Sequence, residues 1–394
     1  MKNVLILGSS GSIGENALDI ARRLPDELKI AGLAVNRNYR RALEQAAEFG
    51  VKHVAVADPE SADACERAAP AHITVHKGTA GLCELVTMHP SAMVLSAVVG
   101  MAGLPAVLAA VKQGSDVALA TKEVLVAAGE LVTAECARTG ARILPVDSEH
   151  NAILQCLTTE QAWCLHYHNQ PFAPPPVRRL LLTASGGPFA RQTDIDLSKV
   201  TVEEALNHPN WSMGRKVTID SATLINKGLE IIEAHWLFGI PFDRIDVIIH
   251  PESIVHSMVE FNDNSILAQM SIPDMRFAIQ YALLYPHRCH SALPRLNLAT
   301  SGNLTFMQPD EARFPGLRIA RSAAECGGTA PAVMNAANEV AVERFLAGNI
   351  AFSAIWQLIE KTLEAIELHG TPSLEEIIAA DQRAREYCLK CATT

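Results

Sequence analysis

The chain has 394 residues, of which 49% are hydrophobic and 19% are charged, and 43 acidic against 33 basic side chains give a net charge of -10. This length exceeds one ordinary hydrophobic core, so two or three domains are expected, and the composition excludes a disordered chain. The acidic balance and the absence of a dense Lys/Arg run argue against a nucleic-acid partner, so an anionic ligand must be captured by a local site.

The first 150 residues alternate short apolar runs with helical segments. Continuous apolar strands that alternate with helices are typical of a parallel sheet covered on both faces. We therefore predict an α/β protein whose residues 1–150 form a Rossmann-like, NADPH-binding domain. The expected strands are 3–7, 29–35, 52–57, 93–97, 117–120 and 141–146, and the expected helices include 15–23, 39–49, 104–113 and 122–138.

Residues 89–111 contain no Asp, Glu, Lys or Arg and are long enough to span a bilayer. Gly100, Gly103 and Pro105 interrupt this stretch, so a buried strand, a glycine turn and a helix explain it better. The apolar run at the start is too short for a secretory signal, and the nine cysteines are scattered and odd in number. We expect a soluble, cytoplasmic protein with no membrane partner.

A proline-rich break at 171–176 ends this pattern. Around and beyond it we predict a central α+β catalytic domain, residues 151–285, with a lid loop near 207–216. Asn262-Asp-Asn264 has the composition of a hairpin turn. The expected elements are a helix from about 222 to 238 and the strands 179–183, 246–250, 254–261 and 265–271.

The last part of the chain has helical periodicity only. We predict a linker at 286–312 and a C-terminal α-helical bundle at 313–394. Ser373-Leu-Glu-Glu376 is a capping box for the final helix. The expected helices lie near 316–325, 331–346, 353–367 and 374–390.

Gly8-Ser-Ser-Gly11-Ser-Ile-Gly14 follows the first strand and opens the first helix. Glycines at such a turn let the backbone approach a pyrophosphate, and the helix N-terminus offers it free N–H groups. The spacing is a variant of GxGxxG, and taken alone it is equally typical of a structural glycine turn. Its position in a strand–helix series favours a dinucleotide site.

The end of the second strand, Ala34-Val-Asn-Arg-Asn38, indicates which dinucleotide is bound. NAD sites usually place Asp or Glu there to bind the ribose 2′-hydroxyl. Here the segment holds no acid and one cation, and a guanidinium pairs with a 2′-phosphate. An ordinary solvated loop is the alternative. We predict NADPH, with Asn36 and Asn38 as further hydrogen-bond partners.

Two acidic residues follow the strand expected at 141–146. In extended backbone Asp147 and Glu149 would point the same way and converge on one cation at the carboxyl end of a parallel strand. Two carboxylates without a nearby Cys favour Mg²⁺ or Mn²⁺. A solvated acidic loop explains this pair equally well when it is taken alone.

The segment 221–238 adds a second polar face. At 100° per residue Asn226, Lys227 and Glu230 fall on one arc, opposite an apolar arc that packs inward. We expect Ser221 to cap the start of this helix, where free N–H groups also attract phosphate. A solvated helix face is the alternative.

Two loops complete the candidate site. Ser185-Gly-Gly187 suits close approach of backbone to an anion, or is simply a turn. His208-Pro-Asn-Trp-Ser-Met-Gly-Arg-Lys216 has the composition of a lid that excludes water. For His250, His256 and the segment 273–276 we favour structural roles.

Taken in order, the motifs GSSGSIG, TKE, VDSEHNA, SGGPF, HPNWSMGRK, DSATLINKGLE and NAANE resemble the 1-deoxy-D-xylulose 5-phosphate reductoisomerase family from residue 1 to about 390. Thr121 stands where the family often has Asn, and Asn36-Arg37 where it often has Gly-Lys. The first difference puts one cofactor contact in doubt, and the second keeps the positive charge.

The resemblance implies a site, residue by residue. NADPH contacts are implied for Ser10, Gly11, Ser12, Ile13, Asn36, Arg37, Asn38, Thr121, Glu123 and Gly214. Substrate contacts are implied for Lys122, Ser148, Glu149, Ser185, His208, Trp211, Met213, Ser221, Asn226, Lys227 and Glu230. The divalent ion, Mg²⁺ or Mn²⁺, is implied on Asp147, Glu149 and Glu230, which with Lys122 are the expected catalytic residues.

The reaction implied is the skeletal rearrangement and NADPH reduction of a small phosphorylated sugar by a homodimer. Two other functions fit parts of the sequence. A simple NADP-dependent phospho-sugar dehydrogenase explains the nucleotide loop but needs no site of three carboxylates. A dinucleotide-sensing regulatory protein with a helical partner module would tolerate loss of the carboxylates.

Overall fold

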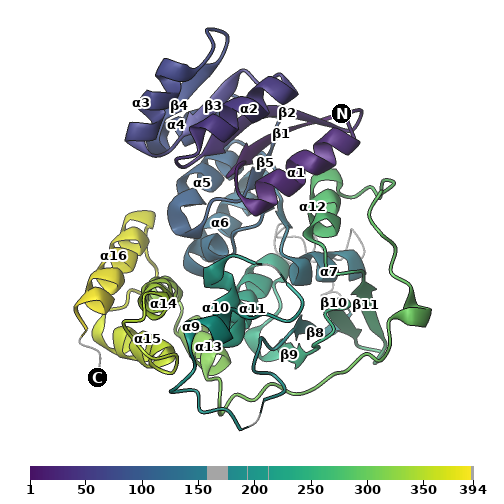
Figure 1. The fold of residues 1–394 in the computed structure, drawn as a ribbon, viewed down its shortest axis with the longest axis vertical. Coiled ribbons are helices and arrows are strands. Elements are labelled where there is room, and N and C mark those ends of the chain that lie inside the picture. Colours follow the sequence, from purple (N-terminus) through teal and green to yellow (C-terminus); the bar gives the residue numbers. More distant parts are fainter. Residues whose placement is uncertain (158–175, 193, 212, 392–394) are drawn as a thin grey trace.

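The computed structural model describes residues 1–157, 176–192, 194–211 and 213–391. Its N-terminal part is a seven-stranded parallel sheet, in the order β4-β3-β2-β1-β5-β6-β7 (Figure 1). The chain builds outward from β1 to β4 and then returns to the other side of β1. The strands are β1 (Lys2–Leu7), β2 (Leu28–Val35), β3 (His53–Val56), β4 (Thr74–Lys77), β5 (Met93–Ser96), β6 (Val117–Leu119) and β7 (Ile143–Pro145).

The reversal of direction between β1 and β5 is a topological switch point, where open α/β sheets bind ligands at the carboxyl ends of the strands. The strands other than the edge strand β4 are mostly buried, which explains their continuous apolar sequences. The predicted Rossmann-like sheet is confirmed. The helices of this part are α1 (Ser12–Arg23), α2 (Tyr39–Phe49), α3 (Pro59–Ala68), α4 (Gly78–Thr87), α5 (Leu104–Lys112) and α6 (Glu123–Thr139).

The segment 89–111 forms β5, a 3₁₀ turn at Gly100–Gly103 and then α5, as predicted. No helix in the described residues is long and apolar enough to cross a membrane. The sequence analysis did not predict β4 or its flanking helices α3 and α4. β4 is a four-residue edge strand, mostly solvent-accessible, and therefore has no apolar run to reveal it.

Helix α6 is broken near its middle. Ala128 has non-helical backbone angles, and the indole ring of Trp236 lies where a side chain at Gly129 would project. A Cβ at Gly129 would come within 2.2 Å of that ring. The close approach packs α6 directly against α11 (Ile225–Phe238).

A second, four-stranded sheet has the order β11-β10-β8-β9. β8 and β9 pair in parallel, while β10 is antiparallel to both β8 and β11, and the hairpin predicted at 262–264 joins β10 to β11. Helices α7 (Ser148–Cys156) and α11 pack on this sheet. The strands are β8 (Val177–Ala184), β9 (Ile245–Ile249), β10 (Val255–Phe261) and β11 (Ile266–Met270).

The helices near this sheet differ from those predicted. The single helix predicted from 222 is in fact α10 (Arg215–Ala222) followed by α11, because Leu224 between them has a left-handed backbone with φ 60°. The unpredicted helix α12 (Met275–Leu284) packs against α1. A short helix, α9 (Val202–Leu206), precedes the lid segment.

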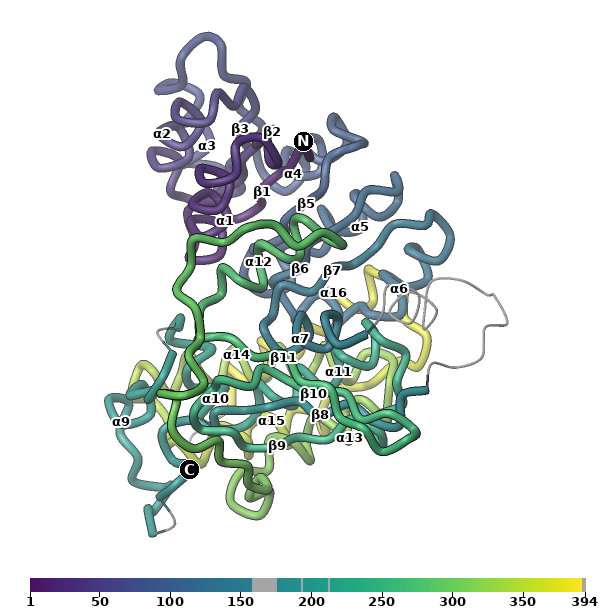
Figure 2. Tube along the Cα trace, turned by 90° about the vertical axis from the view of Figure 1, so that its right-hand side faces the viewer, coloured from purple at the N-terminus to yellow at the C-terminus, as the bar shows by residue number. Residues whose placement is uncertain are grey.

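Residues 286–315 run along one side of the molecule to the C-terminal helices, with one 3₁₀ turn at Leu298–Thr300 (Figure 2). The four predicted helices are present, and the capping box of Ser373 and Glu376 is formed. Helix α14 is central: it contacts the other three and also α6 and α10. The helices are α13 (Gly316–Cys326), α14 (Ala330–Leu346), α15 (Ala354–Ala365) and α16 (Leu374–Lys390).

Candidate active site

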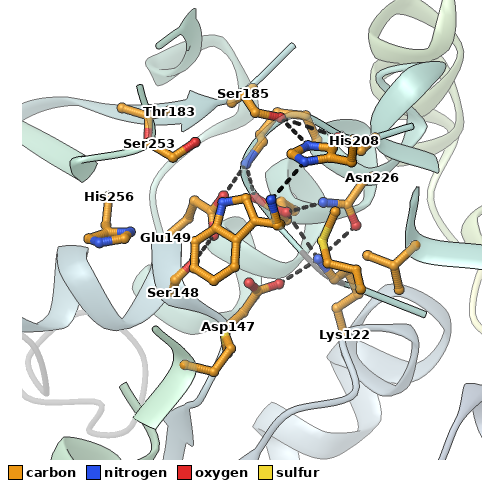
Figure 3. A pocket seen from close by; sticks show the side chains of 18 of the residues that line it. Lys122, Asp147, Ser148, Glu149, Thr183, Ser185, His208, Asn226, Ser253 and His256 are labelled. Atoms are coloured by element: carbon orange, nitrogen blue, oxygen red, sulfur yellow. Dashed lines mark hydrogen bonds and ion pairs between the residues drawn. The ribbon is translucent and has the colours of Figure 1, made fainter. Parts of the chain in front are cut away.

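A cavity of about 260 Å³ lies between the carboxyl ends of β6 and β7, the end of β8 and the helices α10 and α11 (Figure 3). Many residues that the sequence singled out line it, although they are far apart along the chain. They are Ser12, Ile13, Lys122, Asp147, Ser148, Glu149, Ser185, His208, Trp211, Met213, Gly214, Ser221, Asn226, Lys227 and Glu230.

Three carboxylates meet in this cavity. Asp147, Glu149 and Glu230 each place an oxygen within 4.8 Å of the other two. Their convergence was predicted, but the reason given for Asp147 and Glu149 was wrong. Only Asp147 has extended backbone, because α7 begins at Ser148 and carries Glu149 in its first turn.

Two lysines lie among these carboxylates. The ammonium of Lys122, which directly precedes α6, contacts Asp147 and lies 3.0 Å from Glu230 Oε1. The ammonium of Lys227 lies 2.7 Å from Glu149 Oε1 and also contacts Glu230. Asn226 accepts a hydrogen bond from Lys122 at 2.9 Å, so the polar arc predicted on this helix is used as a unit. Figure 3 shows Lys122 and Asp147 turned toward each other across the cavity.

The charges in this cluster stabilise one another. Burial alone would lower the pKa of Lys122, but the carboxylates of Asp147 and Glu230 outweigh it and hold that pKa well above its ordinary value. Burial would raise the pKa of Asp147, but the Lys122 cation holds it below its usual range. For Glu149, burial and the neighbouring Glu230 charge raise the pKa. The cluster has more negative than positive groups, which favours a further cation.

The donor set fits a hard divalent ion. All three candidate ligands are carboxylates, and among the described residues no cysteine lines the cavity. Oxygen ligands of this kind are those that Mg²⁺ and Mn²⁺ prefer. One oxygen of each carboxylate lies within 4.8 Å of the other two, so a single ion can reach all three.

Beneath the three carboxylates lie two residues to which sequence reasoning gave no role. His150 Nε2 is 2.8 Å from the backbone oxygen of Glu230, and its Nδ1 is 3.2 Å from the carboxylate of Glu233. If Nε2–H donates to that oxygen, the neutral ring carries no proton on Nδ1, and a neutral carboxyl of Glu233 suits this ring better than a carboxylate does. Burial lowers the pKa of His150 to about 4 and raises that of Glu233 well above its usual range, which agrees with this neutral pair.

The sequence held one signal for Glu233. It lies one turn after Glu230 on α11, at a position surrounded by apolar residues, where an acid is buried unless it is partnered.

A polar pocket adjoins the carboxylates at the end of β8. His208 Nδ1 accepts hydrogen bonds from the backbone N–H groups of Asn210 and Trp211, so a neutral ring donates from Nε2 to Ser185 Oγ, 2.8 Å away. Burial lowers the pKa of His208, which favours that neutral form. Ser185 Oγ is also 3.4 Å from Ser221 Oγ.

The prediction that Ser221 caps the start of the helix expected from about 222 to 238 is wrong. Ser221 lies in the last turn of α10, and α11 begins four residues later at Ile225. Its hydroxyl nevertheless faces the predicted pocket. Gly187 permits this, because a Cβ there would lie 2.8 Å from Ala222 Cα and 3.0 Å from the Ser221 oxygen.

The segment predicted to be a lid lies over this pocket. Asn210 donates to the backbone oxygen of Pro251 and lies 3.4 Å from Ser253 Oγ, while the ring of Trp211 meets that of His256 edge-on, with centroids 6.2 Å apart. These contacts, made by described residues of the segment, are polar or edge-on, which suits a segment that moves.

The glycine loop after β1 has the geometry that a dinucleotide needs. Gly8 has φ +92°, and a Cβ at Gly14 would lie 2.4 Å from the Gly8 oxygen, so turn and helix pack closely. Gly11 begins α1 without a side-chain cap, which leaves the N–H groups of the first turn available for phosphate. Ser12 and Ile13 connect this loop to the cavity.

The other predicted cofactor residues have mixed settings. Arg37 is 78% exposed and pairs with Asp58 at 3.2 Å, while Asn38 caps α2 through the backbone N–H of Arg41. Thr121 donates its hydroxyl to the Val98 oxygen at 2.7 Å. Glu123 is bound by Lys216 at 2.8 Å. Ser10, Gly11, Asn36, Arg37, Asn38, Thr121 and Glu123 do not line the cavity itself.

The residues for which structural roles were favoured do have such contacts. His250 Nδ1 lies 2.8 Å from the Thr305 oxygen, and its Nε2 accepts backbone N–H groups from Ile254 and Val255. Arg276 binds Asp19 on α1 at 2.9 Å. His250 and His256 also line the cavity, and His256 contacts the lid segment, so His256 combines both settings.

Comparison with known families agrees with this geometry. Three domain profiles match in succession: 1-deoxy-D-xylulose 5-phosphate reductoisomerase over residues 4–129, its C-terminal domain over 143–238, and the DXP reductoisomerase C-terminal domain over 270–387. A 1-deoxy-D-xylulose 5-phosphate reductoisomerase of Symbiobacterium thermophilum is 50% identical over 390 residues, covering 98% of this chain and 97% of that protein. One of Pelotomaculum thermopropionicum is 48% identical over 392 residues, covering 99% and 98%.

Solved structures give the same result. The chain is similar to 1-deoxy-D-xylulose 5-phosphate reductoisomerase from Zymomonas mobilis in complex with NADPH, with a TM-score of 0.89, 40% identity and 98% coverage of both chains. It is equally similar, at a TM-score of 0.89 and 38% identity, to a DOX-P reductoisomerase in complex with NADPH, fosmidomycin and magnesium, covering 99% of this chain and 98% of that one.

Proposed function

Because the chain belongs to the 1-deoxy-D-xylulose 5-phosphate reductoisomerase family, it is a metal-dependent NADPH enzyme of isoprenoid biosynthesis, and we propose how its residues divide the work. The reaction rearranges the carbon skeleton of 1-deoxy-D-xylulose 5-phosphate and then reduces the aldehyde to 2-C-methyl-D-erythritol 4-phosphate. The observation that carries the residue assignment is the meeting of three carboxylates and two lysines in one cavity beside the dinucleotide loop.

Asp147, Glu149 and Glu230 hold the divalent ion, Mg²⁺ or Mn²⁺, and with Lys122 form the catalytic group. An ion bound there would supply Lewis acidity at the substrate. Lys122 is a hydrogen-bond donor at the same point, since its ammonium already donates to Asn226 and contacts two carboxylates. It is placed to donate to a substrate oxygen as charge develops there.

The phosphate and hydroxyl groups of the substrate bind the neighbouring polar pocket. Ser185 and His208 form one wall and Ser221 adjoins them, all with hydroxyl or imidazole donors. Lys227 supplies positive charge, and Ser148, at the start of α7, adds a hydroxyl and a free helix N-terminus. Binding energy from the phosphate, which is remote from the reacting carbons, drives closure of the segment with Trp211 and Met213 and excludes water.

NADPH binds along the switch point of the large sheet. The loop Ser10–Ile13 receives the pyrophosphate, and the exposed guanidinium of Arg37, between Asn36 and Asn38, receives the 2′-phosphate. Thr121, Glu123 and Gly214 lie toward the nicotinamide end, although the hydroxyl of Thr121 is already used by the backbone.

The assembly is a homodimer, acting in the cytoplasm and without a nucleic-acid partner. β11 is an edge strand whose Ile266 and Leu267 are about half exposed, and such an edge is suited to pairing with a second copy. The cysteines in the described part of the chain are free, as in a reducing compartment. Net charge -10 disfavours nucleic acid.

The test is an NADPH-oxidation assay with 1-deoxy-D-xylulose 5-phosphate and Mg²⁺, with and without a chelator, followed by NMR of the product. We expect ion-dependent oxidation and a branched carbon skeleton. An unbranched product would show a simple dehydrogenase, and the absence of oxidation would favour a regulatory dinucleotide sensor.

A further inference from the structure

The NAANE motif of the C-terminal helix α14 has no part in the function proposed above, yet it is buried. Asn335 and Asn338 are fully buried amides, and burying such groups costs free energy unless they are hydrogen-bonded. The partner of Asn338 is Asp220 on α10, outside the C-terminal bundle. The partner of Asn335 is Glu339, whose carboxylate lies against the turn at Gly100. The motif therefore connects the bundle to other parts of the molecule.

One line of contacts runs from α14 to the start of α6. Asn338 Nδ2 donates to Asp220 Oδ1 on α10 at 2.9 Å, and Asp220 Oδ2 lies 2.9 Å from the ammonium of Lys216. The same ammonium binds Glu123 Oε1 at 2.8 Å. Glu123 is one of the residues assigned to the cofactor, and Lys216 is two residues after Gly214, which is another, so the end of this line away from α14 lies on the cofactor side.

Glu339 makes a second link to the same region. Its carboxylate is held by Arg385 of α16 at 2.6 Å and by Asn335 at 3.1 Å. A Cβ at Gly100 would lie 3.3 Å from Glu339 Oε1, so this carboxylate rests against the turn that follows β5. That turn lies beside the switch point of the sheet.

Lys216 and Glu123 stabilise each other in their charged forms. Burial would lower the pKa of Lys216, but the carboxylates of Asp220, Glu123 and Glu339 raise it. Burial would raise the pKa of Glu123, but the Lys216 cation lowers it. A fixed cation between two carboxylates restricts where each can lie.

We propose that Asn338, Asp220 and Glu339 are positioning residues through which the C-terminal helices set the NADPH side of the site. Asn338 bonds Asp220, and Asp220 binds Lys216. Lys216 in turn fixes Glu123 and the start of α10 in the geometry that the dinucleotide needs. Glu339 lies against the turn at Gly100 and adds a negative charge near Lys216. The inference rests on the proposed placement of Glu123 and Gly214 at the cofactor. The alternative is that these contacts stabilise the fold and have no effect on NADPH binding.

The experiment measures the Kd of NADPH by fluorescence titration of the intact protein, without substrate or ion. Asn338→Leu keeps the side-chain size and removes the donor to Asp220. We expect the Kd for NADPH to rise about tenfold, the cost of losing a hydrogen bond to a charged group. The KM for the sugar phosphate should change less than the Kd for NADPH, since no side chain along this line of contacts lines the cavity.

A matched control is Thr362→Val, at another buried polar residue of the bundle. Its hydroxyl bonds only the Leu358 oxygen and Cys388 Sγ within the bundle. This variant lowers stability and leaves the Kd for NADPH unchanged. Equal changes of Kd in Asn338→Leu and Thr362→Val would overturn the proposal, because a general loosening would then explain both.

Lys216→Met is the second variant, at a side chain that is 23% exposed and binds Asp220 and Glu123 directly. It raises the Kd for NADPH, and the double variant adds little to either single change, since both act through one line of contacts. If Asn338→Leu does not fold, an unchanged Kd in folded Lys216→Met overturns the proposal. The titration needs no turnover, so an enzyme that binds NADPH but forms no branched product would refute the proposed function and leave this inference standing.

Discussion

The two ends of the proposed ligand groove are built in opposite ways. At the ion end, Lys122, Lys227 and Glu230 are buried and tied to one another by several contacts each. At the adenosine end, Arg37 is 78% exposed and has one ion pair, to Asp58. A buried charge that loses its partner costs several kcal/mol, whereas an exposed pair contributes about 1 kcal/mol or less. The same kind of substitution should therefore have very different effects at the two ends.

The largest expected effect is at the ion end. Glu230→Gln keeps the size of a side chain that contacts both lysines but removes one ion ligand and one charge. We expect kcat to fall by a factor on the order of 10³ while NADPH binding survives, because the ligand acts on the reacting oxygens. Steady-state kinetics with a parallel NADPH titration measure both. Loss of cofactor binding would refute the assignment of Glu230 to the ion.

The next effect concerns stability beneath the ion end. His150 is buried and its pKa is lowered to about 4 from the ordinary 6.5, mainly by burial. Between these two pH values the unfolded chain binds a proton that the folded chain does not, so the stability present above pH 6.5 is lost as the pH falls toward 4. The loss reaches about 3 kcal/mol.

The measurement is urea unfolding at several pH values across this window, for the parent protein and for His150→Asn. The quantity compared is the change of the unfolding free energy with pH, not its absolute value, because the substitution itself lowers stability. We expect a shallower slope in the variant, with other buried histidines supplying the remainder. Identical slopes would mean that His150 is protonated in the folded protein.

At the adenosine end the expected effect is smaller and selective. Arg37→Ala should weaken NADPH about fivefold to tenfold, the value of a charge-assisted contact at a solvent-exposed position. NADH, which lacks the 2′-phosphate, should be unaffected. Inhibition or binding constants for both dinucleotides decide it, and equal weakening of the two would contradict a role in reading the phosphate.

The smallest expected effect is a spectroscopic one between the two ends. Trp211 meets the His256 ring edge-on, and movement of the lid should alter the surroundings of its indole. We expect a modest change in the fluorescence of the parent protein when a phosphonate analogue of the substrate is added, and the part that Trp211 contributes is the difference from a Trp211→Phe variant. A Trp211→Phe variant of the parent serves as control, and a constant signal from Trp211 would count against closure.

The same contrast explains what the sequence could and could not predict. The buried strands and the polar arc of Asn226, Lys227 and Glu230 are visible because burial imposes a strict pattern on a strand or helix. The break between α10 and α11 is not visible, because Leu224 is a bulky residue in a left-handed conformation that ordinarily costs about 1 kcal/mol. The incorrect cap at Ser221 follows from that one unpredicted residue.

Contacts between distant segments were the other limit. The sequence marks Glu233 as an acid among apolar residues, but its partner His150 is visible only when α7 and α11 are placed side by side. Helix α12 was missed for a related reason: it is short, and Arg276 is fixed by Asp19, a residue more than two hundred positions away. The pocket itself could be foreseen only through its motifs.

The contact between Gly129 and Trp236 has a consequence for the reacting centre. Helix α6 starts beside Lys122, and α11 carries Lys227 and Glu230, so the absence of a side chain at one glycine sets the spacing between a donor and its acceptors two turns away. The arrangement of Lys122, Lys227 and Glu230 thus depends on the packing of Trp236 against Gly129. When the ion or the substrate leaves, its attraction for the charged side chains is lost, but the packing of α6 against α11 is not. The empty site therefore keeps its shape for the next turnover.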